Sequence, residues 1–274
     1  MTPSISGARM ALPQPRAVHW LQPLAWLALG WRDMCRAPWL SLAHGLCLAA
    51  LGAVLLVLGH GHFDWLVGAL TGFLLLGPLV ASSLYAISRA LEQGAPVGWS
   101  LVAQTWMQWQ RTRRSTPHYW CLVQFGALLA LSAAGWMLVS ASLITLLAPQ
   151  RIHTPLEFLQ HVVLAPDGQL FHLWLALGSV LAAPIFASSV VSMPLLLDRK
   201  VSLAQAVLTS WLVILENPVT MAVWAGLILM FSLLGMASLL LGMVFIVPML
   251  GHASWHAYRD TVDASAFALR EAAP

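Results

Sequence analysis

Charged residues are scarce in this sequence of 274 residues: Asp, Glu, Lys and Arg make up 8% of it, against about a quarter in a soluble domain. Hydrophobic residues make up 59%. So few charges cannot cover a water-exposed surface, and we therefore expect most of the surface to face lipid. The formal net charge of +3, from 13 basic and 10 acidic residues, is too small and too scattered to indicate a nucleic-acid partner.

Catalytic and redox motifs are missing as well. The three cysteines, Cys35, Cys47 and Cys121, form no CxxC pair, and we interpret them as small buried hydrophobes. The sequence has no nucleotide-binding loop, no GxSxG elbow and no HExxH motif. No Asp, Glu, Lys or Arg lies in the middle of a long apolar stretch, which disfavours an ion-coupled pump. We predict a non-enzyme without catalytic residues, bound metal or cofactor.

Long apolar stretches are what the sequence has instead. A helix needs about 20 apolar residues to cross the hydrocarbon core of a membrane. Six stretches qualify, and they predict an all-α, polytopic membrane protein with a single transmembrane domain over 18–262. We expect disordered tails at 1–17 and 263–274. The predicted spans are 38–59, 65–88, 119–148, 171–197, 217–235 and 237–257, with a tight turn near Gly235 between the last two.

The basic residues are divided very unequally between the two sides of this six-span arrangement. Twelve lie on the side of the termini, and only Arg151 lies on the other. Because basic loops stay in the cytoplasm, both termini are predicted to be cytoplasmic, in a bacterial inner membrane. The twelve are Arg9, Arg16, Arg32, Arg36, Arg89, Arg111, Arg113, Arg114, Arg199, Lys200, Arg259 and Arg270.

Three segments suggest a threefold internal repeat: "GPLVASSLYAISR" (77–89), "APIFASSVVSMPL" (183–195) and "VPMLGHASWHAYR" (247–259). Pro78, Pro184 and Pro248 coincide in them, and small residues follow at the same offsets. We interpret the unit as an interfacial amphipathic helix followed by two spans. Proline inside a helix removes a backbone hydrogen bond, so we predict kinks at the three prolines.

These segments, together with "GWRDMCRAP" and "FASSVVSMPLLLDRKV", resemble a family of predicted integral membrane proteins of unknown function that is common in proteobacteria. The resemblance covers about residues 25 to 262 and implies no established activity. Some members carry the label cytochrome c oxidase subunit I. A haem–copper core needs histidines on several helices. Here the histidines within spans are His44, His252 and His256, so we reject the catalytic-subunit interpretation.

His252 and His256 stand one helical turn apart and share a helix face. With His44 they form the one candidate cofactor or polar site. A metal site needs three or four ligands, whereas a haem needs one histidine from each of two helices. The alternative is structural: serines occupy the place of His252 in the repeat, so we favour a neutral ring bonded to a serine hydroxyl or a free carbonyl.

Further polar groups lie near the ends of the spans. The stretch "HGHFD" (60–64) offers His60, His62 and Asp64 to a metal ion, although a short polar turn explains it more simply. Basic residues at the inner ends of spans favour anionic headgroups. We predict five headgroup anchors: Arg89, Arg111, Arg113, Arg114 and Arg259.

Two functions of different classes fit these features. The first is a non-enzymatic scaffold or accessory subunit, whose partners are the lipid bilayer and other membrane protein subunits. The second is a small transporter or channel for a neutral or amphiphilic solute, since internal repeats often frame a site at the midplane. A haem- or copper-binding accessory protein is a third and weaker alternative.

Overall fold

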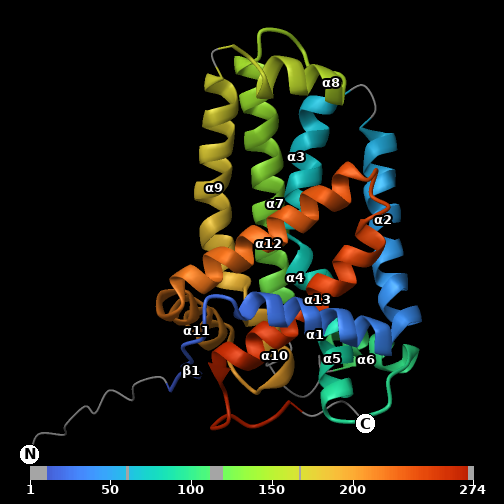
Figure 1. Cartoon of the computed structure of the whole chain (residues 1–274), viewed down its shortest axis with the longest axis vertical. Coiled ribbons are helices and arrows are strands. Elements are labelled where there is room, and N and C mark those ends of the chain that lie inside the picture. Colours follow the sequence, from blue (N-terminus) through green and yellow to red (C-terminus); the bar gives the residue numbers. More distant parts are fainter. Residues whose placement is uncertain (1–10, 60–61, 112–119, 167, 271–274) are drawn as a thin grey trace, which may run out of the picture.

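The computed structural model of the protein describes residues 11–59, 62–111, 120–166 and 168–270. Its helices form an elongated bundle, in which most of the long helices follow the long axis (Figure 1). The predicted all-α class is confirmed for these residues, with one small two-stranded sheet in addition. We call one end of the bundle the basic end, because it carries Arg32, Arg36, Arg89, Arg199 and Arg259.

Four of the described helices are long and apolar enough to cross a membrane, judged by length and composition. All four match predicted spans to within two residues at either end. Each begins where an apolar run begins. Helices α2 and α12 start with Pro38 and Pro218, and proline suits the first turn because an N–H at this position has no partner within the helix. The four are α2 (Pro38–Leu58), α7 (Trp120–Leu147), α9 with α10 (Gln169–Asp198) and α12 (Pro218–Ala237).

The predicted span 65–88 is not one helix. It is divided into α3 (Phe63–Leu74), α4 (Gly77–Val80) and α5 (Ser82–Glu92). Pro78 lies in the first turn of α4, directly after the first interruption, where its missing N–H cannot continue the ladder from α3. The other two prolines of the repeat lie inside helices. Pro184 is in α9 (Gln169–Ser189), which α10 (Ser192–Asp198) follows after a short turn, and Pro248 is in α13 (Met243–Thr261).

The predicted last span, 237–257, also needs correction. Helix α12 continues through Gly235 to Ala237, and α13 begins only at Met243. Helix α13 then extends four residues beyond the predicted end. It is not among the four long apolar helices, because its second half carries His252, His256 and Arg259.

Three amphipathic helices lie at the basic end: α1 (Gln22–Arg36), α6 (Trp99–Arg111) and α11 (Leu203–Glu216). They precede α2, α7 and α12 respectively in the chain. Figure 1 shows α1 lying across the direction of the long helices. A capping box, in which Ser202 and Gln205 bond reciprocally, starts α11. At the opposite end, α8 (Pro155–Phe158) and one π-helical turn, η3 (Leu159–Val163), form a short cap.

The two predicted tails are partly ordered. Strand β1 (Gln14–Pro15) pairs antiparallel with β2 (Val262–Asp263), and Arg16 makes a 2.8 Å ion pair with Asp263. The chain then passes the C-terminal end of α10, where Arg199 forms an antiparallel bridge with Leu269. Strand or bridge contacts thus occur at residues 14–15 of the first tail and at residues 263 and 269 of the second, whereas residues 1–10 and 271–274 lie outside the described ranges.

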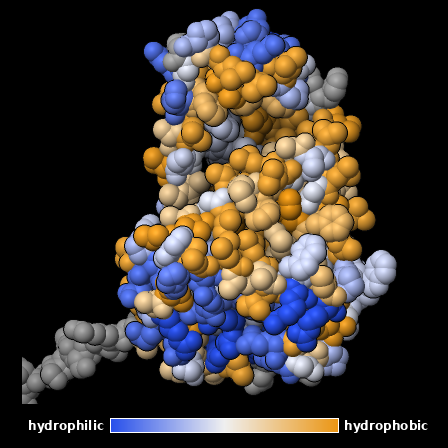
Figure 2. Space-filling view, viewed as in Figure 1, coloured by the Kyte–Doolittle hydropathy of each residue, from blue (hydrophilic) through white to orange (hydrophobic). Residues whose placement is uncertain are grey.

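The largest hydrophobic core lies in the basic half of the molecule, where Trp26, Trp224, Trp255 and Tyr258 are fully buried. Farther from that end, large apolar side chains face outward along the long helices. Figure 2 shows this apolar surface as a band between two more polar ends. The band suits a hydrocarbon environment. Cys35 and Cys47 lie on the exposed surface, so the prediction that they are buried was wrong.

Candidate functional site

The inner histidine of α13, His252, is fully enclosed by protein. Its Nε2 lies 2.9 Å from Oγ of Ser41 on α2, and its Nδ1 lies 2.7 Å from Oγ of Ser88 on α5. The ring therefore joins three helices that are far apart in the sequence. Both partners are serine hydroxyls, the kind of group that we favoured for this position.

The surroundings of His252 specify which ring nitrogen carries the proton. The Ser41 hydroxyl donates to the carbonyl oxygen of Ala37 at 2.8 Å, so its oxygen is left to accept a hydrogen bond. His252 consequently donates from Nε2 and accepts from Ser88 at Nδ1. A neutral imidazole satisfies this arrangement completely.

His44 makes a similar pair of contacts on the neighbouring turn of α2. Its Nδ1 donates to the carbonyl oxygen of Leu40 at 2.6 Å, because a carbonyl can only accept. Its Nε2 then accepts from the hydroxyl of Ser83 on α5. His44 and His252 thus fasten α2 and α5 together at two successive levels.

The outer histidine of the pair, His256, contacts an acidic residue that the sequence analysis did not single out. Its Nε2 donates to Oδ2 of Asp33 on α1 at 2.8 Å. The Asp33 side chain is only 2% exposed, while Arg32 and Arg36 approach it at 3.9 Å from the more exposed side. Helix α1 is thereby attached to α13 by a largely buried hydrogen bond between an imidazole and a carboxylate.

Burial raises the pKa of Asp33, but the hydrogen bond and the charge of His256 outweigh burial and leave the pKa below its ordinary value of 3.8. Asp33 is therefore a stable anion. A signal for it was present in the sequence, because Trp26, Gly30 and Asp33 follow one face of an amphipathic helix. An acidic residue on the apolar face of such a helix points to a buried partner.

The three candidate histidines do not form a ligand set in this arrangement. His44 and His252 each have both ring nitrogens engaged by protein groups, so neither offers a lone pair to a metal or a haem iron. Across the described ranges, no group of three or more His, Cys, Asp or Glu side chains could hold a metal ion. In "HGHFD", His60 lies outside these ranges, and Asp64 accepts from Thr145 at 3.2 Å.

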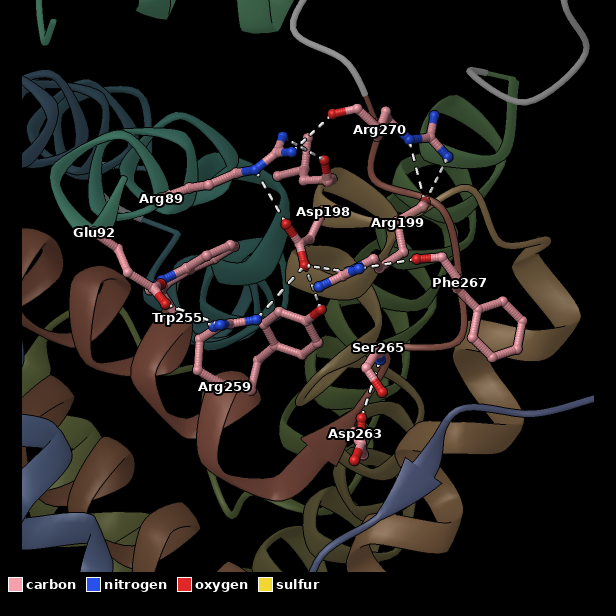
Figure 3. A network of polar contacts seen from close by, with 12 residues as sticks. Arg89, Glu92, Asp198, Arg199, Trp255, Arg259, Asp263, Ser265, Phe267 and Arg270 are labelled. Carbon is pink, nitrogen blue, oxygen red and sulfur yellow. Dashed lines mark hydrogen bonds and ion pairs between the residues drawn. The ribbon is translucent and has the colours of Figure 1, made fainter. Parts of the chain in front are cut away.

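A second polar cluster, centred on Asp198 at the end of α10, lies at the basic end (Figure 3). Its carboxylate, 3% exposed, accepts from Nε of Arg199 at 2.8 Å and from the hydroxyl of Tyr258 at 2.8 Å. Arg89 Nε lies 3.1 Å from the other carboxylate oxygen. One buried anion thus faces two buried cations and a phenol, which balances the cost of removing it from water.

The same cluster extends along α13 to Glu92, the last residue of α5. One carboxylate oxygen of Glu92 accepts from Trp255 at 2.9 Å, and the other pairs with Arg259 at 2.9 Å. Arg89 also donates to the carbonyl oxygen of Arg270 at 2.8 Å, which ties down the C-terminal segment. The ends of α5, α10 and α13 are therefore held in one network.

Two of the five predicted headgroup anchors, Arg89 and Arg259, pair with acidic side chains of the protein. The Arg89 side chain is only 17% exposed and faces Asp198, so it is an internal ion-pair partner. Arg259 is 38% exposed and is shared between Glu92 and the network. Arg111 is the last residue of α6, while Arg113 and Arg114 lie outside the described residues.

A helical bundle with an apolar belt, several membrane-length helices and polar groups confined largely to its ends defines a multi-pass integral membrane protein. Consistent with this class, residues 66–198 match the model of a family described as predicted integral membrane proteins (DUF2189). The family resemblance deduced from the sequence motifs is confirmed over these residues. Comparison with curated proteins and with solved structures finds no match.

Proposed function

We propose that this protein is a non-enzymatic scaffold or accessory subunit of a membrane complex. The observation that carries the proposal is that its central buried polar groups already have hydrogen-bonding partners within the protein. His252, Asp33 and Asp198 bond to side chains on other helices, and His44 bonds to Leu40 on its own helix and to Ser83 on α5. Such groups stabilise one arrangement of the bundle, whereas a catalytic site needs a reactive group that is free to meet a substrate.

The proposal includes an orientation. We infer that the basic end faces the cytoplasm of a bacterial cell, with the protein in the inner membrane and both termini cytoplasmic. The twelve-to-one distribution of basic residues supports this orientation. Several of these residues, among them Arg89, Arg199 and Arg259, pair with acidic groups at the basic end, and this pairing leaves the number of basic residues on each side unchanged.

We also propose that the chain consists of three repeats, each with an interfacial helix, an ascending helix and a descending helix, so that six segments enter the membrane. The junctions between the first two helices of a unit support this repeat. Ala37 before Pro38 has φ −132° and ψ 58°, and Asn217 before Pro218 has φ −128° and ψ 52°. Both values lie outside the helical region, which a residue before proline avoids. The middle junction, at Pro117, lies outside the described residues.

The transporter alternative has less support. Among the described residues, one small apolar cavity of about 10 Å³ lies between α2, α3, α12 and α13. A shallow surface pocket of about 330 Å³ is lined by residues 17–20 and 216–220 at the basic end. Neither lies between α5, α10 and α13, where Gly251 packs directly against Leu84. Neither of these two cavities therefore offers a solute site between the three helices.

Site-specific photo-crosslinking in membranes tests the scaffold proposal. A photoreactive amino acid would replace exposed apolar residues on different faces, namely Leu46, Leu131, Val180 and Leu229. A scaffold should give a discrete protein adduct from one face and only lipid adducts from the others. The positions on the remaining faces serve as matched controls.

Two results would contradict the proposal. One is the absence of a discrete protein adduct at every position in native membranes. The other is turnover of a substrate by purified protein that is lost when His252 and His256 are both replaced by Ala.

A further inference from the structure

The turn between α12 and α13, residues 238–242, differs from the other loops in its composition. It reads Ser-Leu-Leu-Leu-Gly, without a charged residue. Leu239 and Leu241 are 82% and 72% exposed, among the most exposed large apolar side chains of the described residues. A loop that emerges into water or headgroups rarely presents leucines in this way. Its surface suits hydrocarbon.

The backbone of this turn supplies its own hydrogen-bonding partners. Ser238 Oγ donates to the carbonyl oxygen of Gly235 at 2.8 Å and accepts from the N–H of Gly242 at 2.7 Å. The N–H of Met243 donates to the carbonyl oxygen of Leu240 at 3.0 Å. In lipid, backbone polar groups must be satisfied within the protein. Four backbone groups of the turn meet this requirement: the carbonyl oxygens of Gly235 and Leu240 and the N–H groups of Gly242 and Met243.

The reversal requires unusual backbone conformations. Leu239 and Leu240 have φ values of 53° and 69°, in the left-handed region that residues other than glycine seldom adopt. They are the described non-glycine residues with positive φ. A glycine or asparagine would suit these positions in a water-exposed turn. Leucines at these two positions carry backbone strain, and their apolar side chains suit a tip that lies in hydrocarbon.

Contacts with α2 locate the depth of the turn. Val244 approaches Gly45, and Leu240 approaches Gly52. With a rise of 1.5 Å per residue, Gly52 lies about 21 Å above Pro38 and about 9 Å below Leu58. Helix α2 as a whole is about 31 Å long, close to the thickness of the hydrocarbon core. The turn therefore lies at a level about two-thirds of the way along α2, measured from Pro38 at the basic end.

The polar cap of the molecule lies beyond this level. It includes Arg151, His153 and Glu157, which come from the segment between α7 and α9. Figure 1 shows α12 running obliquely and ending below the cap formed by α8. A helix of 20 residues is about 30 Å long, so only its inclination keeps α12 from reaching the far side.

We propose that α12 and α13 form a re-entrant hairpin, which enters the membrane from the basic end, turns within the hydrocarbon and returns to the same end. Lipid acyl chains surround its leucine tip. The chain then crosses the membrane four times, through α2, α3 to α5, α7, and α9 with α10. The number of crossings remains even, so the two termini stay on one side, as the basic residues require.

Spin labels in proteoliposomes test this proposal. Cys35, Cys47 and Cys121 would be replaced by Ala in the full chain, and single cysteines would be introduced by Leu239→Cys and Leu241→Cys. Gln93→Cys marks the basic end, and Gln150→Cys marks the opposite end. Because Leu239 and Leu241 are exposed, their replacement removes little packing. Circular dichroism would verify that each variant retains its helices.

If the tip is re-entrant, spin labels at positions 239 and 241 should be accessible to molecular oxygen and protected from a water-soluble nickel chelate. Labels at positions 93 and 150 should show the opposite pattern. Neither leucine position should react with a membrane-impermeant maleimide from either side. The proposal would be overturned if both leucine positions were accessible to the nickel chelate and reacted with the maleimide from the same side as Gln150→Cys. These outcomes are read against the two reference positions, so they do not depend on whether the protein is a scaffold.

Discussion

Substituting Gly45 by alanine should loosen the contact between α2 and α13. A Cβ atom at this position would lie 2.1 Å from the carbonyl oxygen of Val244, and 2.6 and 2.7 Å from the next two backbone atoms of that residue. Ordinary contacts begin near 3.4 Å, so α13 must move away by about 1.3 Å, the difference between the two distances. No flexible side chain is available to absorb this shift.

Two opposing terms determine the size of the effect. Alanine favours the helical conformation over glycine by about 1 kcal/mol. Overpacking costs about 1–3 kcal/mol, and the cost here should lie at the upper end because the obstacle is backbone. We expect a net loss of about 1–2 kcal/mol in the free energy of unfolding. The Val244 carbonyl is affected in particular, because Pro248 has no N–H to bond it.

Thermal unfolding of the detergent-purified protein, followed by tryptophan fluorescence, measures this loss. At about 2–4 °C per kcal/mol, the midpoint should fall by several degrees. Gly226→Ala on α12 is the matched control, since a Cβ there meets nothing within 4 Å. The control should be neutral or slightly stabilising. If Gly45→Ala behaved like Gly226→Ala, the close approach of α2 and α13 would be disproved.

Asp198→Asn should lower the free energy of unfolding by about 3 kcal/mol or more, because it leaves the largely buried Arg89 beside a neutral group. Chemical denaturation measures this loss. A much smaller loss would contradict the ion pair between Arg89 and Asp198. For Asp33, the lowered pKa means that its stabilisation is present above pH 3.8 and is lost as the pH falls through the lowered value. Asp33→Asn should therefore flatten the stability profile below about pH 4, and an unchanged profile would contradict the pairing with His256. The absorption spectrum of purified wild-type protein should show no Soret band, whereas a clear band would revive the haem alternative.

The sequence predicted the long apolar helices well, because an uninterrupted apolar run permits only one structure in lipid. Helices α2 and α7 begin and end within one residue of their expected limits. Interruptions were harder to place. The prolines alone did not locate them, since the helix breaks before Pro78 but continues through Pro184 and Pro248.

The polar groups show a different limit of prediction from the sequence. Counting basic residues indicates which side of the membrane they occupy, but it does not distinguish a residue that meets headgroups from one that meets an internal acid. Arg89 illustrates this, since its partner Asp198 comes from a helix over 100 residues away in the chain. The sequence favoured a serine as partner of His252, yet Ser41 and Ser88 could be identified only once three helices were placed together.

The packing of α1 against α13 has a consequence for synthesis of the protein. Asp33 meets His256, and Trp26 donates to Asp260 at 2.8 Å, across more than 200 residues of chain. At about 5–20 residues per second, roughly 10–45 seconds separate the emergence of these partners from the ribosome. During that interval α1 has its apolar face without its final partner, and an amphipathic helix in that state rests on the membrane surface. The first helix made is thus among the last to reach its final position, and the nascent chain must keep Asp33 hydrated until α13 arrives.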